Sequence, residues 1–490
     1  MIIKSILTWM SGLRFWDRVP RDAMVVVKSI PHLEEGTPHL CAGAEMFVFE
    51  FGPADHRSLE ERRKDWWYEW VGFGVPKSAL MTRETLLKDR ELSDAIKRHP
   101  FLSSTQILSS CLLAEMSKGK GSWWHPYLIQ LPRNYDTLTS FTRFEARALQ
   151  VDDAIWAAEK AISKAELDWK EARPLMQELK LKPQLLTFRS WLWSSATISS
   201  RTLHIPWDDA GCLCPVGDFF NYAAPGEEFL CSEDVEKLDA RQSDDHIQRL
   251  TDGGYEENVA AYCFYARKRY KKGEQVLLSY GTYTNLELLE HYGFLLNANP
   301  NNKVFLSLEP DIHSTSSWPK DSLYIEQDGK PSFALVSALR LWATPPNKRK
   351  SIGHLAYSGS QLSAENEISV MRWTANNCRL ILEKLPTAIE DDTLLLQAIE
   401  KMQDHLSPKE VEQLLLAFGD EFGAFFEANG LLKGESGVEF PLCRKIRRSM
   451  DRWKLAVQWR LRYKKILCDC VSYSNMIIWG KSIGPITIKL

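Results

Sequence analysis

The hydrophobic pattern of this chain changes twice along its length, and these changes constrain the fold more than any other feature. Apolar residues recur at helical spacing from about 102 to 199, in blocks separated by turn residues and prolines. After Arg201 the pattern breaks into short apolar runs between turns, which is typical of strands. Helical spacing returns from about 332 to 475. The sequence therefore predicts an irregular β core that contains a helical insertion and is followed by an all-helical domain.

This pattern divides the chain into three regions. The first, 1–72, has strand-like runs but no continuous period, and we assign it no fold. The second, 73–310, holds the β core, with the helical insertion at about 102–185. The third, 330–475, is the helical domain. Within the β core we predict a hairpin of two strands, at 259–267 and 275–279.

Composition excludes several classes of protein. The 61 Lys and Arg against 64 Asp and Glu give a net charge of -3, so no overall positive field is available to hold nucleic acid. No run of about 18 apolar residues is present that could cross a membrane. No secretory signal precedes the ten cysteines, and we expect a monomer in a reducing compartment. The cytoplasm or the nucleus fits best, and the chloroplast stays open although the sequence has no clear transit peptide.

Several common catalytic and metal-binding motifs are missing from the sequence. We find no phosphate loop, no Gly-x-Ser-x-Gly elbow, no His-Glu-x-x-His helix and no paired Cys-x-x-Cys site. The pairs Cys212-x-Cys214 and Cys468-x-Cys470 each supply only half of a zinc site, so buried or free thiols are the favoured interpretation. The sequence predicts no metal centre.

Two polar segments stand out because packing alone does not explain them. The first follows Arg201 and contains Asp218-x-x-Asn221; the second contains Ser279-Tyr280-Gly281 at the end of a predicted strand. Taken singly, Asp218 with Asn221 would be an ordinary turn or helix cap, Arg201 a structural ion pair, and Tyr280 a core tyrosine. Their joint occurrence in this order is what calls for another explanation.

In this order and spacing the segments resemble the SET-domain protein methyltransferases. The similarity is to the branch that contains the Rubisco large-subunit lysine methyltransferase and the actin-histidine methyltransferase. Asp218-x-x-Asn221 is similar to the family's Asp-x-x-Asn-His motif, and 279–281 to its tyrosine motif. Residues 122–136 resemble its linker into the helical insertion, and 75–82 the end of its N-terminal strand segment. The resemblance implies an α+β fold, with a SET β core and a helical insertion, followed by an all-helical substrate-binding domain.

The resemblance also implies an activity and a set of site residues. The chain would use S-adenosylmethionine to methylate a lysine side chain of a non-histone protein docked on the helical domain, with no membrane or nucleic-acid partner. Tyr280 would be catalytic and would orient the incoming amine, and Tyr283 would contact the substrate. The residues expected to bind the cofactor are Arg201, Asp218, Phe219, Phe220, Asn221, Tyr222, Tyr292, Gly293 and Phe294. An asparagine amide and an arginine can hold the amino-acid end of the cofactor, and aromatic rings can stack on its adenine or line the acceptor channel.

The sequence departs from the family pattern at two places, and alternatives therefore stay open. Tyr222 stands where the family has histidine, and no Gly-x-Gly turn precedes Val75-Pro76 at the family's distance, because Gly72-Phe73-Gly74 is too close. A catalytically weak SET-like protein that binds partners is one alternative, and a histidine methyltransferase is another. A third concerns 444–465, which holds ten Lys and Arg and one acid. That stretch is either a solvated helix face or a docking surface for an acidic protein or RNA.

Overall fold

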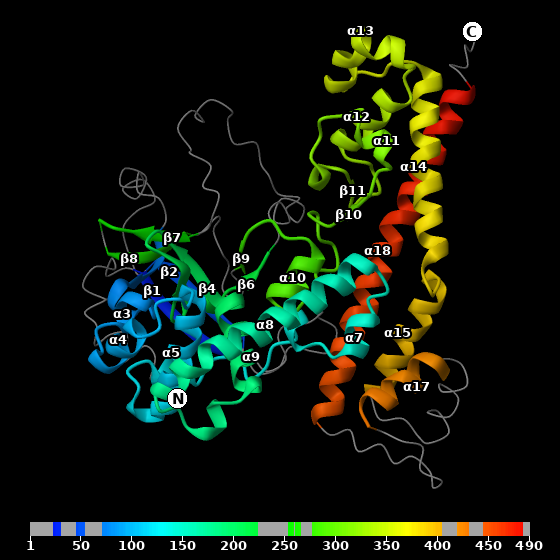
Figure 1. Cartoon of the computed structure of the whole chain (residues 1–490). Coiled ribbons are helices and arrows are strands. Elements are labelled where there is room, and N and C mark those ends of the chain that lie inside the picture. Colours follow the sequence, from blue (N-terminus) through cyan, green and yellow to red (C-terminus); the bar gives the residue numbers. More distant parts are fainter. Residues whose placement is uncertain are drawn as a thin grey trace, which may run out of the picture. The chain divides into compact units, whose positions relative to one another are not determined.

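The computed structural model describes residues 23–30, 46–53, 71–223, 253–258, 260–265, 277–403, 419–430 and 444–483. The chain divides into two units (Figure 1). The first unit comprises Met1–Ser140, Lys160–Thr282 and Leu289–Phe294. The second comprises Phe141–Glu159, Tyr283–Leu288 and Leu295–Leu490.

The first unit is built on short strands in small sheets. The strands β3 (Val71–Pro76), β8 (Ala261–Tyr265) and β7 (Gly253–Glu256) form an antiparallel sheet in the order β3-β8-β7. Two further pairs are β4 (Thr202–Ile205) with β5 (Asp208–Leu213), antiparallel, and β6 (Asn221–Tyr222) with β9 (Leu277–Leu278), parallel. The predicted hairpin is therefore wrong for the residues described: β8 pairs with β3 and β7, and β9 pairs with β6.

The N-terminal region contributes one separate hairpin. The strands β1 (Ala23–Ile30) and β2 (Met46–Pro53) pair antiparallel with each other and form a two-stranded sheet of their own. Among the described residues, no strand before Val71 pairs with β3. The sheet beside Val75-Pro76 thus receives no partner from this hairpin.

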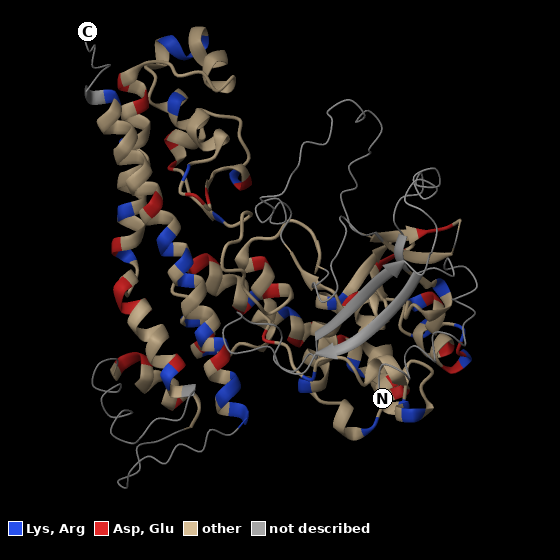
Figure 2. Ribbon diagram, turned by 180° about the vertical axis from the view of Figure 1, so that it is seen from behind, with Lys and Arg blue, Asp and Glu red and all other residues tan. Residues whose placement is uncertain are grey.

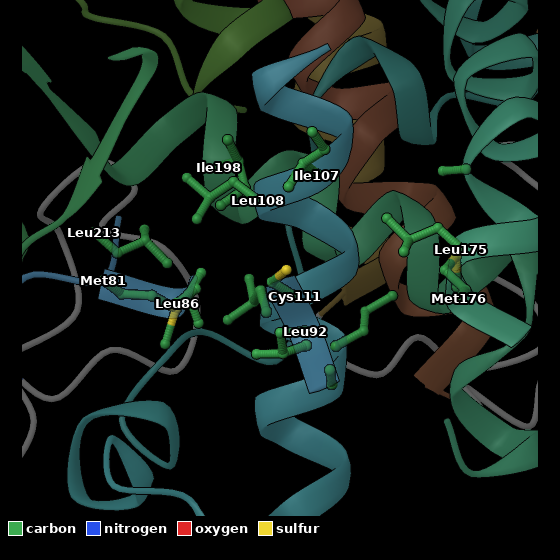
Figure 3. Close-up of a cluster of buried hydrophobic side chains, with 14 of the residues drawn as sticks. Met81, Leu86, Leu92, Ile107, Leu108, Cys111, Leu175, Met176, Ile198 and Leu213 are labelled. Carbon is green, nitrogen blue, oxygen red and sulfur yellow. The ribbon is translucent and has the colours of Figure 1, made fainter. Parts of the chain in front are cut away.

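Helices cover the strands of the first unit and supply its larger hydrophobic core. The helices are α3 (Arg83–Leu86), α4 (Arg90–Lys97), α5 (Ser104–Lys118), α6 (His125–Leu128), the later part of α8 (Asp152–Glu178) and α9 (Phe188–Arg201), with 3-10 turns η2 (Lys77–Ala79), η3 (Gly119–Gly121), η4 (Leu138–Ser140), η5 (Pro183–Leu185) and η6 (Gly217–Phe219). The Ser103 side chain caps α5 in a capping box with Gln106. Figure 3 shows Leu108 and Cys111 of α5 at the centre of a buried cluster. Helices therefore occupy the predicted insertion in the described residues, and α5 lies in the core of this unit.

The second unit is mostly helical. Its elements are α7 (Arg143–Arg147), the start of α8, the start of α10 (Asn285–His291), β10 (Lys303–Phe305), α11 (Pro310–His313), η8 (Lys320–Ser322), β11 (Tyr324–Glu326), α12 (Phe333–Trp342), α13 (Pro346–Tyr357), α14 (Ala364–Lys384), α15 (Ile389–Gln403), α17 (Gly419–Ala428) and α18 (Arg444–Ile483). The strands β10 and β11 pair antiparallel. The 40-residue α18 packs along α14 and α15, and its Ile466, Leu467 and Cys470 enter the core of this unit.

Part of the positive charge on α18 is used inside the second unit. Figure 2 shows Lys and Arg along this helix, yet Arg460 and Lys464 are at most 1% exposed. Arg460 contacts Asp392 and Glu421, at 2.8 Å each, and Lys464 contacts Asp392 at 2.6 Å. Arg452 and Lys454 form further ion pairs, with Glu145 and Glu400. These side chains hold neighbouring helices to α18, so neither a solvated face nor a docking surface describes them.

Candidate active site

A short parallel pairing brings the two polar segments of the sequence together. In β6 and β9, Asn221 lies opposite Leu277 and Tyr222 opposite Leu278. The Ala223 amide extends the pairing with a 3.0 Å hydrogen bond to the Leu278 carbonyl. Because parallel strands need a long crossover connection, only the folded chain can place these segments side by side.

Two tyrosine hydroxyls tie the segments together crosswise. The Tyr280 hydroxyl donates a hydrogen bond to the Phe220 carbonyl, and the Tyr222 hydroxyl donates to the Gly281 carbonyl at 2.8 Å. Gly281 has a φ of 131°, in the region that favours glycine, and the backbone turns there directly after Tyr280. Each segment therefore fixes the position of a tyrosine ring in the other.

Aromatic rings gather around Tyr280. Its ring lies 5.1 Å from that of Tyr222 and is stacked on Tyr292 at 5.2 Å, measured between ring centroids. Phe294 lies 6.1 Å from both Tyr222 and Tyr292. Gly293, between Tyr292 and Phe294 in the sequence, has a φ of 79°. A Cβ at this position would lie 2.8 Å from the Asp136 carbonyl carbon. Glycine is therefore required at 293 by a close backbone approach.

A buried ion pair forms a second centre. Arg201, the last residue of α9, donates from Nη1 to the Asp218 carbonyl at 2.9 Å and lies 3.4 Å from Asp218 Oδ2. Its Nε donates to the Tyr135 hydroxyl at 3.2 Å. Tyr127 donates its hydroxyl proton to Asp218 Oδ2 at 2.7 Å. Burial raises the pKa of the Asp218 carboxyl, and the nearby Arg201 guanidinium opposes that rise.

Both centres open on one pocket of about 380 Å³ in the first unit. Of the predicted site residues, Arg201, Asp218, Tyr280 and Tyr292 line it. The remaining lining residues are Ser200, Thr202, Leu203, His204, Pro206, Gly217, Gly253, Gly254, Tyr255, Tyr262, Phe264, Leu278 and Ser279. The Arg201–Asp218 pair and Tyr280 therefore line one cavity, whose walls are of mixed polar and apolar character.

The other predicted residues lie outside the pocket lining. Phe219 stacks on Tyr127 at 6.2 Å, and Phe220 is 5% exposed and packs against Phe264 at 5.6 Å. Both phenylalanines thus hold the 217–222 segment in place. Asn221, Tyr222, Gly293 and Phe294 flank the lining residues along β6 and after α10. Tyr283 belongs to the second unit, where its carbonyl accepts a hydrogen bond from Asn299 at 2.8 Å.

Sequence reasoning missed most of the pocket wall. Tyr262 and Phe264 lie on one face of β8 at the strand period of two, a signal that could have identified them as a pair. Gly217 and Leu203 gave no such signal, because nothing in their local sequence separates them from core residues. In the part of the chain that the structure describes, no three His, Cys, Asp or Glu side chains group to hold a metal ion. Nor is any helix in that part long and apolar enough to cross a membrane.

Comparisons with known proteins identify relatives of this chain. Residues 287–467 match the family described as Rubisco LSMT substrate-binding. Over 448 residues the chain is 54% identical to "Protein SET DOMAIN GROUP 40" of Arabidopsis thaliana, covering 89% of this chain and 90% of that protein. It is 23% identical over 391 residues to the actin-histidine N-methyltransferase of Mus musculus, covering 72% of this chain and 60% of the mouse protein.

The fold also matches that of a solved structure. A crystal structure of the SET domain of LSMT bound to lysine and AdoHcy superposes with a TM-score of 0.56 at 15% identity, covering 97% of this chain and 91% of that one. The likeness confirms the predicted α+β class with a helical C-terminal part.

Proposed function

The chain belongs to the SET-domain protein methyltransferases that carry a Rubisco LSMT substrate-binding domain, and on this premise we propose that it methylates a lysine side chain of a non-histone protein with S-adenosylmethionine as the donor. The family resemblance drawn from the sequence motifs is thereby confirmed. The observation that carries the proposal is the pocket that the Arg201–Asp218 pair and Tyr280 line together.

The charged end of the pocket fits the amino-acid portion of this cofactor, which carries a carboxylate and an ammonium group. Arg201 offers a guanidinium to the carboxylate. Asp218 Oδ1 is buried and has no hydrogen-bond partner among the described residues, so it can accept from the ammonium group. Asn221, at the edge of β6, has an amide donor and acceptor for the same end. When bound, S-adenosylmethionine would supply an electrophilic methyl group on its sulfonium centre.

Tyr280 is suited to orient the acceptor. Its hydroxyl is held through the Phe220 carbonyl, and the phenol oxygen has lone pairs that can accept from the N–H of an incoming amine. Tyr222 and Tyr292 pack on its ring and limit its motion. Alignment of donor and acceptor can supply most of the rate of an in-line transfer, so a fixed hydroxyl is what such a reaction needs.

The walls support a lysine acceptor. Leu203, Leu278 and Phe264 suit the aliphatic stem of lysine, and an apolar, aromatic surrounding lowers the pKa of an amine because it disfavours the charged form. A neutral amine is the form that attacks. Histidine remains the second candidate acceptor, because one relative in the family is named as an actin-histidine N-methyltransferase.

Methyl transfer from tritiated S-adenosylmethionine to the proteins of a cell extract tests the proposal. Wild-type protein should label protein, and amino-acid analysis of the product should give methyl-lysine. Tyr280→Phe should lose about 100-fold or more in rate, within the range for one positioned catalytic group. Tyr357→Phe, at an exposed tyrosine of the second unit, is the matched control and should keep full activity. Full labelling by Tyr280→Phe would show that Tyr280 has no part in the mechanism. Methyl-histidine in the product would show that the acceptor is histidine and not lysine.

A second candidate function is a partner-binding protein with little activity. It is favoured by one observation, that among the described residues no strand before Val71 pairs with β3. Titration calorimetry separates the two: micromolar binding of S-adenosylmethionine supports the enzyme, and no binding at millimolar cofactor supports the binding protein.

A further inference from the structure

Tyr127 reaches the charged end of the pocket from outside both polar segments. It lies on α6 in the helical insertion, is fully buried, and donates its hydroxyl proton to Asp218 Oδ2 at 2.7 Å. We propose that Tyr127 is a positioning residue, which orients the Asp218 carboxylate so that its second oxygen remains available to the ammonium group of the cofactor. The inference rests on the proposed function and extends it to a residue that touches neither cofactor nor substrate.

Tyr127 is held in one place by its surroundings. Its ring stacks on Phe219 with an angle of 24° between the ring planes. Three residues earlier, the Trp124 indole donates a 3.0 Å hydrogen bond to the Ala79 carbonyl, and Trp124 is 8% exposed. Two buried hydrogen bonds therefore fix this short helix, one to η2 and one to Asp218. A rigid donor can select one rotamer of the carboxylate that it contacts.

The contacts of the Asp218 carboxylate are unequally distributed between its two oxygens, and this supports the role proposed for Tyr127. Tyr127 and Arg201 both lie on the Oδ2 side, at 2.7 and 3.4 Å, whereas Oδ1 has no partner among the described residues. A buried acceptor without a partner is unfavourable unless a ligand satisfies it. Arg201 also contacts the Asp218 carbonyl at 2.9 Å, so it does not depend on the carboxylate alone for its place. Tyr127 is therefore the group whose hydrogen bond is directed at the carboxylate alone.

The same contact affects the charge of Asp218. The titratable or charged groups around it are Tyr127 from α6, Arg201 from α9, Tyr135 through Arg201, and the thiols Cys212 and Cys214 on the β5 side. Burial raises the pKa of Asp218, whereas Arg201 and the hydrogen bond from Tyr127 lower it. Burial also raises the pKa of Tyr127 well above 10, so its hydroxyl stays a donor. Loss of that hydroxyl should raise the pKa of Asp218 further.

The first test needs no cofactor. Because the folded-state pKa of Asp218 is raised, the wild type should lose stability relative to Asp218→Asn as pH increases through that pKa. The same comparison is then made between Tyr127→Phe and the double variant Tyr127→Phe/Asp218→Asn. There the loss of stability should extend to a higher pH than in the wild-type background. Urea unfolding between pH 4 and pH 8 measures it. Coincident pH profiles in the two backgrounds would overturn the inference.

The second test measures cofactor binding by calorimetry. Tyr127→Phe keeps the ring on Phe219, and its dissociation constant for S-adenosylmethionine should rise about tenfold, which corresponds to about 1.4 kcal/mol. Ser194→Ala is the matched control, since it removes another buried hydroxyl, which donates to the Ser109 carbonyl at 2.8 Å, and it should bind as the wild type does. Equal affinity of Tyr127→Phe and wild type would show that Tyr127 acts only in folding. If the pH profiles of the two backgrounds differ but the wild type binds no cofactor, the proposed function is refuted and the Tyr127–Asp218 contact is supported.

Discussion

One added methyl group at Gly217 should report on the wall of the pocket more directly than any other change. A Cβ built at this position would lie 2.4 Å from Cζ and 2.6 Å from Cε2 of Phe264, and 2.7 Å from the sulfur of Cys214. Carbon atoms in good contact are about 3.5–4.0 Å apart, so Gly217→Ala overlaps the ring by about 1 Å. The φ of Gly217 lies outside the left-handed region, and the effect is therefore steric alone.

The size of the effect follows from what holds Phe264. Its ring is 4% exposed and packs on Phe220 at 5.6 Å and on Tyr262 at 5.1 Å, so it has little room to move. Overpacking of such a site costs about 1–3 kcal/mol. Replacement of glycine restricts the unfolded chain and offsets about 0.4–1 kcal/mol of this. We expect a net loss of about 1–2 kcal/mol, together with weaker cofactor binding because Phe264 lines the pocket.

Urea unfolding of a double-mutant cycle tests this reasoning. Phe264→Leu alone should be destabilising, but in the Gly217→Ala background the smaller side chain makes room for the methyl group. The combined loss should therefore fall short of the sum by about 1 kcal/mol. Gly254→Ala is the control, because a Cβ there meets no atom within 4 Å although Gly254 also lines the pocket. Additive losses, or a Gly217→Ala variant as stable as Gly254→Ala, would show that the wall is not packed as described.

Two further substitutions, each with a matched control, test how much a buried charge and a close backbone approach contribute to the stability of the fold. Asp392→Asn leaves Arg460 and Lys464 buried without a full counter-charge and should lose about 3–5 kcal/mol in urea unfolding, whereas Glu421→Gln, at a carboxylate 24% exposed, should lose about 1 kcal/mol or less. Similar losses in both would contradict the assignment of Asp392 as the shared partner. Gly293→Ala should be less stable than Gly430→Ala, because both have a φ near that of a left-handed turn but only Gly293 approaches backbone, 2.8 Å from the Asp136 carbonyl carbon. Equal melting temperatures for the two would mean that the close approach at Gly293 is relieved by backbone movement.

Hydrophobic periodicity predicted the helices well, because helical spacing is a local signal that a long helix repeats over many residues. The helical spacing from about 332 to 475 agrees with α12, α13, α14, α15, α17 and α18 in the described residues, and α18 continues to Ile483. The pattern does not show that the helical insertion is interrupted between α7 and α8, where Gln150 takes a φ of 62°. A single left-handed residue leaves almost no trace in a hydrophobic pattern.

The strands could not be predicted to the same extent. The strands β6 and β9 are two residues each, too short for an alternating pattern to register. Their pairing is set by contacts between distant segments, which local propensity does not contain. The hairpin prediction was wrong for this reason: a turn signal between two predicted strands indicates where a chain can reverse, but not which strand it pairs with afterwards.

The candidate site divides in the same way. Arg201, Asp218 and Tyr280 were predicted because their order and spacing resemble the motifs of a known family, and the structure brings all three to one pocket. Leu203, Gly217 and Phe264 were missed because a pocket wall and a core have the same composition. Tyr127 was missed as a site residue because its partner lies in another part of the chain, 91 positions away.

The brief pairing of β6 with β9 has a consequence for how sequences of this kind can vary. A strand of two residues cannot form alone, so this part of the site should take shape late in folding, after the surrounding core has restricted both segments. Doubling the length of the connection between them would raise the closure free energy by only about 0.6 kcal/mol. A shift of one residue in the pairing, in contrast, would turn each side chain to the opposite face of the strand. Insertions in the connection between Ala223 and Leu277, outside β7 and β8, should therefore be tolerated far more readily than a single insertion between Leu278 and Tyr280.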